Sequence, residues 1–102
     1  MITAQMLDRL VEAEIQLLPL TQIENHWVFG RDGFVALVER TKDNGVGRIG
    51  SPGLLTERGM AVLVERDGRK LFVAKGFEEA ATDEQVSLLR SFSRDLETAL
   101  TP

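Results

Sequence analysis

Residues 60–74 read MAVLVERDGRKLFVA, two apolar runs on either side of an Asp-Gly pair. Asp67 and Gly68 are residue types favoured at the centre of a type I′ turn, where both φ angles are positive. The pair therefore predicts a tight hairpin, in which Val62 lies opposite Val73. One face of this hairpin then carries Ala61, Leu63, Phe72 and Ala74, and the other carries Val62, Val64, Leu71 and Val73.

Both faces of the predicted hairpin are apolar. Strands of this kind lie centrally in a sheet and are covered on both sides. Helices of the same chain are expected on one face. A second subunit is the cover that we expect on the other, because a large exposed apolar face typically marks an interaction site.

Other strands are predicted upstream of this hairpin. Residues 26–30 and 34–40 flank Arg31-Asp32-Gly33, which is a second hairpin signal. The sequence Lys-Asp-Asn-Gly at 42–45 predicts a further turn, after which residues 46–49 return as a short strand. Together with the two strands of 60–74, these segments make about five strands.

Helices are predicted at both ends of the sheet region. An apolar spacing of three and four residues, with Thr3 as N-cap, predicts a helix over 3–18. A second helix is predicted over 83–99, where Thr82 and Gln85 have the spacing of a capping box. Residues 51–59 combine Ser, Pro and a closing Gly, which predicts a short helix.

The predicted fold class is therefore α+β. It comprises a mainly antiparallel sheet of about five strands, built from two hairpins and flanked by N- and C-terminal helices. The order is α-β-β-β-(short α)-β-β-α. With 102 residues, of which 43% are hydrophobic and 27% charged, we expect residues 1–102 to form a single domain.

The composition leaves little chemistry for catalysis. The chain has no cysteine and one histidine, so disulfides, thiolate metal sites and cysteine nucleophiles are excluded. His26, Asp32 and Ser51 follow the order of one type of catalytic triad, but no G-x-S-x-G motif surrounds the serine. We therefore expect a protein without enzymatic activity, cofactor or metal site.

The charge of the chain makes some classes of partner less favourable than others. The net charge is −4, which disfavours nucleic acid because that binding rests on neutralising phosphates. No stretch of the sequence is apolar over the ~18 residues that a membrane span needs, and Asp8, Glu12 and Glu14 lie where a signal peptide would be uncharged, so a cytoplasmic location is expected. Residues 40–75 are basic between two acidic ends, so this segment either binds an anion or complements the acidic helices.

A glycine-rich motif in the basic segment is the candidate ligand site. Residues 45–50 match G-x-G-x-x-G, but Pro52 and the hairpin that follows do not fit a dinucleotide-binding unit. A looser anion site remains, in which an arginine and free amides at the start of the short helix hold a phosphate or carboxylate. Within the loop 45–53 its residues would be Gly45, Gly47, Arg48, Gly50 and Ser51.

Two functions follow from these observations. The first is a non-enzymatic protein-interaction module that acts as a homodimer or binds another protein. Large aromatic and strand-face residues are its expected anchors, namely Trp27, Phe29, Val62 and Val73. The alternative is a small-ligand or anion-binding domain that uses the loop 45–53 with Arg48.

Overall fold

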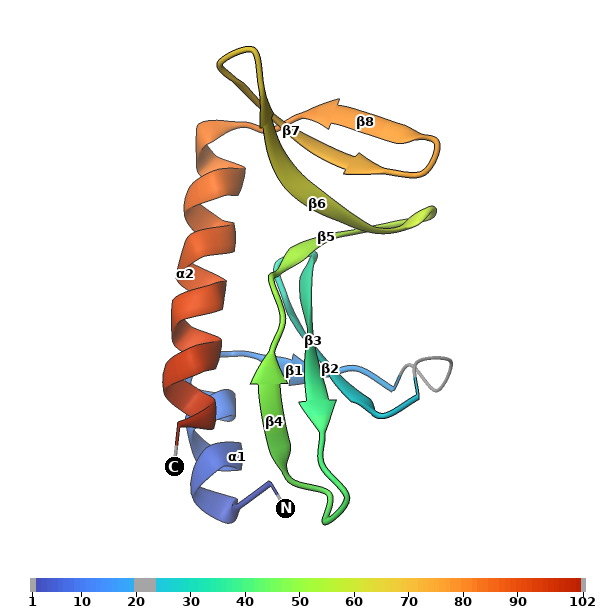
Figure 1. Cartoon of the computed structure of the whole chain (residues 1–102). Coiled ribbons are helices and arrows are strands. Elements are labelled where there is room, and N and C mark those ends of the chain that lie inside the picture. The colour runs from blue at the N-terminus through green and yellow to red at the C-terminus, as the bar shows by residue number, and fades with distance from the viewer. Residues whose placement is uncertain (1, 20–23, 102) are drawn as a thin grey trace.

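The computed structural model describes residues 2–19 and 24–101, which form two helices and eight strands (Figure 1). The helices are α1 (Ala4–Glu12) and α2 (Asp83–Leu100). The strands are β1 (Gln16–Leu17), β2 (His26–Arg31), β3 (Phe34–Arg40), β4 (Val46–Ile49), β5 (Gly53–Thr56), β6 (Gly59–Arg66), β7 (Arg69–Ala74) and β8 (Phe77–Ala80). The α+β class predicted from the sequence is confirmed.

All strands belong to one antiparallel sheet with the order β1-β2-β3-β5-β6-β7-β8, and β4 pairs with β3 beside this path. Helix α2 runs along one side of the sheet, past both the β1–β4 half and the β5–β8 half (Figure 1). Helix α1 packs near the C-terminal end of α2. The predicted count of about five strands is too low, because β1, β5 and β8 join the sheet at segments that carry no long apolar run.

The hydrophobic core lies between α2 and one face of the sheet. Phe92 and Leu96 of α2 are fully buried there, together with aromatic side chains of three strands. The rings of Phe34 and Phe72 contact each other with their centroids 6.0 Å apart. Phenylalanines therefore join the two halves of the sheet to the same helix.

The β6–β7 hairpin has the predicted register. Val62 lies opposite Val73, and the turn residues Asp67 and Gly68 have φ angles of 53° and 76°. The alternation of faces is also confirmed, since Ala61 is fully buried against the core while its neighbour Val62 is 41% exposed. The β2–β3 hairpin uses the same turn chemistry at Asp-Gly 32–33, again with two positive φ angles.

The predicted short helix at 51–59 is wrong, because residues 53–56 form strand β5. Leu54 points into the core and lies opposite Phe34 on one side and Ala61 on the other. Pairing with two strands satisfies the backbone groups of this segment and buries an apolar side chain. A short isolated helix offers neither, so this segment is more stable as a strand of the sheet despite its local capping signals.

Helix α1 begins at the predicted N-cap, where the Thr3 hydroxyl accepts a hydrogen bond from the Met6 amide. It ends at Glu12 and does not reach residue 18 as predicted. The amide of Ile15 donates to the Leu10 carbonyl at 2.9 Å, and Glu14 adopts a left-handed φ of 59°. This is the geometry of a Schellman motif, and it turns Ile15 into the core beside Leu10.

Helix α2 matches its prediction to within one residue. The Thr82 hydroxyl accepts from the Gln85 amide at 3.0 Å, and the Gln85 side chain accepts from the Thr82 amide at 2.9 Å. Both halves of the capping box are therefore present.

Replacing Thr82 with alanine is expected to lower the free energy of unfolding by about 1 kcal/mol, because the Gln85 amide loses its side-chain acceptor. Urea unfolding measures the loss. Hydrogen exchange at residues 83–86 should become faster than in the wild type, and unchanged exchange there would contradict the role of the cap.

Candidate functional site

The sheet has a second face that points away from α2. No helix of the described ranges 2–19 and 24–101 covers it (Figure 1). Strand register brings several apolar side chains together on this face, since Leu55 lies opposite Met60 and Val62 opposite Val73. Leu55 is 46% exposed and Val62 41%. We call this surface the open-face patch and define it as Leu55, Met60, Val62, Val64 and Val73.

The open-face patch includes two of the four predicted interface anchors, Val62 and Val73. The other two, Trp27 and Phe29, belong to the face that packs on the core. Phe29 is completely buried within the chain, so its side chain is not available to a partner. The sequence could not distinguish these faces, because both are apolar.

Trp27 has a role within the chain. Its indole Nε1 donates a hydrogen bond to the Gly45 carbonyl at 3.1 Å, and the Arg40 guanidinium lies 5.3 Å from the ring centroid. A tryptophan with a bonded N–H and a cation over its ring is typical of a structural aromatic residue. Trp27 therefore holds the loop between β3 and β4 against β2.

The glycine-rich motif is part of strand β4 and the turn before it. The Gly50 amide donates a hydrogen bond to the Leu37 carbonyl at 2.8 Å. The space where a side chain at Gly47 would point is already occupied by Glu39. Ser51 stands before a strand, so it has no helix N-terminus to cap. The free amides on which the predicted anion site depended are therefore not gathered here.

The five predicted ligand residues are also divided in space. Gly45 and Gly47 line a hollow of about 470 Å³ together with the acidic Glu97, whereas Ser51 lines another, smaller hollow. Arg48 is exposed on β4 and lines neither of these two hollows. Among the described residues that line the first hollow, Glu97 is the only charged one, so this hollow offers no cation to an anion.

The turn between β3 and β4 contains an acidic group with a shifted pKa. The Thr41 hydroxyl donates a hydrogen bond to the Asp43 carboxylate, and this bond lowers the pKa of Asp43 below its usual value. The same hydroxyl accepts from the Gly45 amide at 2.9 Å. Because Asp43 is exposed, the shift describes a local turn and not a reactive site.

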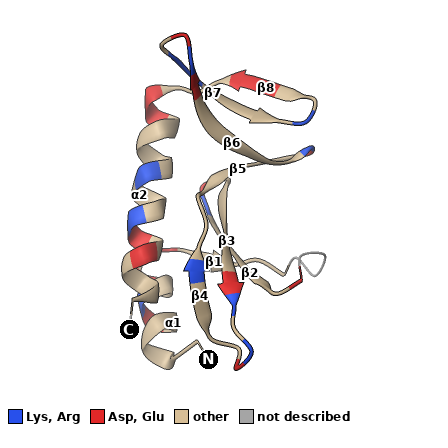
Figure 2. Cartoon of the chain, in the orientation of Figure 1, with Lys and Arg blue, Asp and Glu red and all other residues tan. Residues whose placement is uncertain are grey.

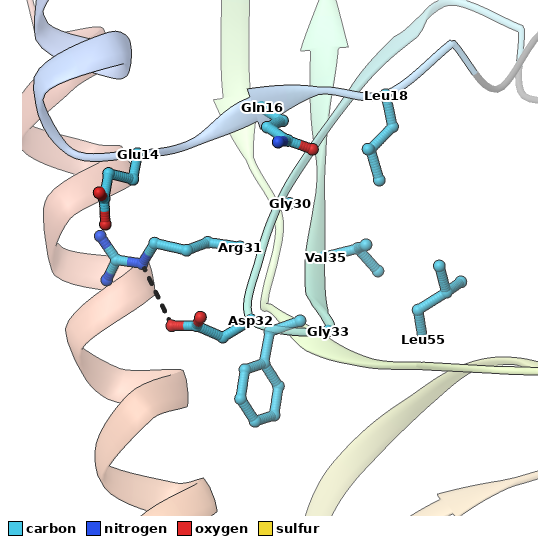
Figure 3. Close-up of a pocket in the computed structure, with 10 residues that line it drawn as sticks. Glu14, Gln16, Leu18, Gly30, Arg31, Asp32, Gly33, Val35 and Leu55 are labelled. Carbon is cyan, nitrogen blue, oxygen red and sulfur yellow. Dashed lines mark ion pairs between the residues drawn. The ribbon is translucent and has the colours of Figure 1, made fainter.

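Arg31 is a key residue that sequence reasoning missed. Its Nη1 atom donates to the Ala13 carbonyl at 2.8 Å and to the Asp95 carboxylate at 2.9 Å, and its guanidinium carbon lies 5.8 Å from the Phe92 ring centroid. Figure 3 shows the side chain extending from β2 toward α2, with Asp32 beside it. The alternation of side chains along a strand could have indicated this position, because residues two apart point to the same face. Arg31 therefore shares a strand face with the core residue Phe29.

Arg31 also borders a hollow of about 340 Å³, which Glu14, Gln16 and Leu55 help to line (Figure 3). The guanidinium is already bonded to the end of α1 and to α2, so it has little capacity left for a ligand. Its arrangement indicates a structural link between the β2–β3 hairpin and both helices.

Of the candidate triad residues, His26 begins strand β2 and Asp32 lies in the turn after it, so the length of the strand separates them. The Nδ1 atom of His26 lies 2.8 Å from the Glu24 carbonyl oxygen, and Asp32 lies beside Arg31. Among the described residues, no group of three or more potential metal ligands of the His, Cys, Asp and Glu types occurs.

Comparison with protein-family models, with curated proteins and with solved structures finds no match for this chain. Within the described part of the chain, no helix is both long enough and apolar enough to cross a membrane.

Proposed function

We propose that the chain is a non-enzymatic protein-interaction module that acts as a homodimer, and that the open-face patch is its contact surface. The observation that carries this proposal is the exposure of Leu55 and Val62 on a sheet face that no described helix covers. A one-sided antiparallel sheet normally alternates apolar and polar side chains. Strands β6 and β7 do not alternate, which is typical of strands covered on both faces.

An ion pair on the open face is compatible with a second copy as its occupant. Arg66 and Glu78 belong to the open face by register parity, and they form an ion pair with an N···O distance of 2.6 Å. These charges neutralise each other within one chain, so two identical faces can meet without facing like charges from this pair. A stable dimer of this kind would bury about 800 Å² of surface on each subunit.

The alternative function, anion binding through the loop 45–53, has less support. Its glycines lie in and beside a paired strand, and Glu97 stands in the hollow that two of them line. A partner other than a second copy is an outcome that the following experiment separates from the homodimer.

Sedimentation equilibrium at micromolar concentration should give twice the chain mass of 11.3 kDa. Replacing Val62 with glutamate is expected to reduce the mass to that of one chain, because two carboxylates would be buried at the two-fold contact. Replacing Val11, which is 75% exposed on α1, with glutamate is the matched control and should leave the dimer intact.

Circular dichroism must show that the Val62→Glu variant remains folded. If that variant unfolds, Leu55→Glu on the neighbouring strand β5 provides the same test. A wild-type mass near 11.3 kDa at concentrations up to roughly 100 μM would overturn the homodimer. The dissociation constant of a stable dimer lies well below that concentration.

A further inference from the structure

A basic groove lies between α2 and β7, on a side of the molecule that the proposed dimer does not use. It has a volume of about 410 Å³. Its residues on α2 include Ser87, Arg90, Ser91 and Arg94. Arg90 and Ser91 follow Ser87 by three and four residues, and Arg94 follows these two by four and three, so all four form a stripe along one face of α2. Lys70 of β7 faces this stripe from the sheet. Figure 2 shows basic positions in the middle of α2 and acidic ones toward its ends.

The three cations of the groove are free of ion pairs within residues 2–19 and 24–101. No carboxylate of this part of the chain lies within 4.0 Å of Lys70, Arg90 or Arg94. Two pairings were open to them, since Glu65 is the register partner of Lys70 and Glu97 follows Arg94 at helical spacing. Neither ion pair forms, so the charged groups of these three side chains face the solvent and the groove.

The spacing of the two arginines is unfavourable without a ligand. Arg90 and Arg94 are four residues apart on one helix, where like charges repel each other and destabilise the helix. The one acid that lines the groove, Asp83, stands in the first turn of α2, where it complements the helix dipole. An anion between the arginines would remove their repulsion.

Hydroxyl groups complete the donor set. The Ser91 Oγ atom accepts a hydrogen bond from Arg31 Nη2 at 3.4 Å, so its own proton is available to a ligand. Ser87 lies one turn earlier on the same stripe and is exposed. The groove thus presents two guanidinium groups, one ammonium group and two hydroxyls.

We propose that this groove binds a phosphate group, carried either by inorganic phosphate or by the phosphate monoester of a small molecule. Guanidinium groups match the oxygens of a phosphate in a two-point geometry, and an ammonium group adds a point charge. Hydroxyls donate to the remaining oxygens. The volume of about 410 Å³ leaves room for a substituent beside the phosphate.

The test is a titration of the full chain with inorganic phosphate and, separately, with glycerol phosphate, followed by two-dimensional amide NMR at constant ionic strength. Saturable shifts are expected at residue 70 and along 87–94. Tighter binding of glycerol phosphate identifies the monoester as the source, and tighter binding of inorganic phosphate identifies the free anion. Absence of saturable shifts at these positions with both probes up to about 50 mM would overturn the site.

Variants separate this groove from general charge attraction. The double variant Arg90→Gln, Arg94→Gln should weaken binding at least about tenfold, because charged hydrogen bonds to phosphate are lost. The matched control, Arg58→Gln with Lys75→Gln, makes the same change in net charge at exposed positions outside the groove and should change affinity less than about twofold. An equal loss in both would overturn the proposal.

Lys70→Gln provides a second test that leaves α2 unchanged. It should weaken binding at least about threefold, because the groove loses the point charge supplied by the sheet. If the double arginine variant does not fold, this variant decides the proposal by the same titration, and an unchanged affinity would overturn it.

Discussion

Replacing Gly53 with alanine is expected to lower the free energy of unfolding by about 3 kcal/mol, near the upper end of the usual range for overpacking. A Cβ atom at this position would lie 2.6 Å from the Ala61 carbonyl oxygen and 2.6 Å from the Met60 Cγ atom. The carbonyl belongs to the backbone of β6, so it cannot move aside as a side-chain end can. Since Gly53 lies opposite both Val35 and Val62, separation of β5 from β6 would divide the sheet.

Urea unfolding of the two proteins at equal concentration measures this loss. Gly68→Ala is the appropriate control, because Gly68 has open space around it but a φ of 76°. Gly68→Ala should lower the free energy of unfolding by about 1 kcal/mol through backbone strain alone. A Gly53→Ala variant no less stable than the control would show that β5 approaches β6 less closely than described.

Replacing Phe72 with alanine is expected to lower the free energy of unfolding by about 4 kcal/mol, because a fully buried aromatic side chain is removed and a cavity remains. Phe72 is 0% exposed on β7 and contacts the ring of Phe34 across the core. Its neighbours include the α2 residues of the same core cluster. Small domains are stable by only about 5–15 kcal/mol in total, so the variant should be close to unfolding at 37 °C.

Thermal unfolding and urea unfolding both report this loss. Val11→Ala on α1, where the side chain is 75% exposed, should change the stability by less than about 0.5 kcal/mol. The loss of stability in Phe72→Leu should lie between those of Phe72→Ala and Val11→Ala, since leucine keeps part of the buried volume. A Phe72→Ala variant that loses no more than the Val11→Ala control would contradict the position of β7 in the core.

The hairpins and the C-terminal helix could be predicted from the sequence because their signals are local. Asp67-Gly68 determines a turn with two positive φ angles, and this turn sets the register through Val62 and Val73. Thr82 and Gln85 likewise mark the start of α2 through hydrogen bonds within four residues. Each signal depends on backbone geometry that a short segment contains in full.

The sequence also led to errors where local signals competed with pairing partners far along the chain. Residues 51–59 carry helix signals, yet 53–56 become a strand because β3 and β6 lie on either side. The apolar pattern beyond Glu12 resembles a helix, yet Ile15 turns into the core and Gln16–Leu17 pair with β2. The segment that forms β8 had no apolar pattern to mark it.

The sequence by itself determined the fold class, the two hairpins, the capped helix and the excess of apolar strand surface. Only the tertiary structure decided which surface is free, since it placed Phe29 inside the core and left Val62 exposed on the open face. It also brought Lys70 beside Arg90 and Arg94, which the chain separates by about 20 residues. The physical reason is that turns and caps form within a few residues, whereas burial and the convergence of charges depend on how distant segments pack.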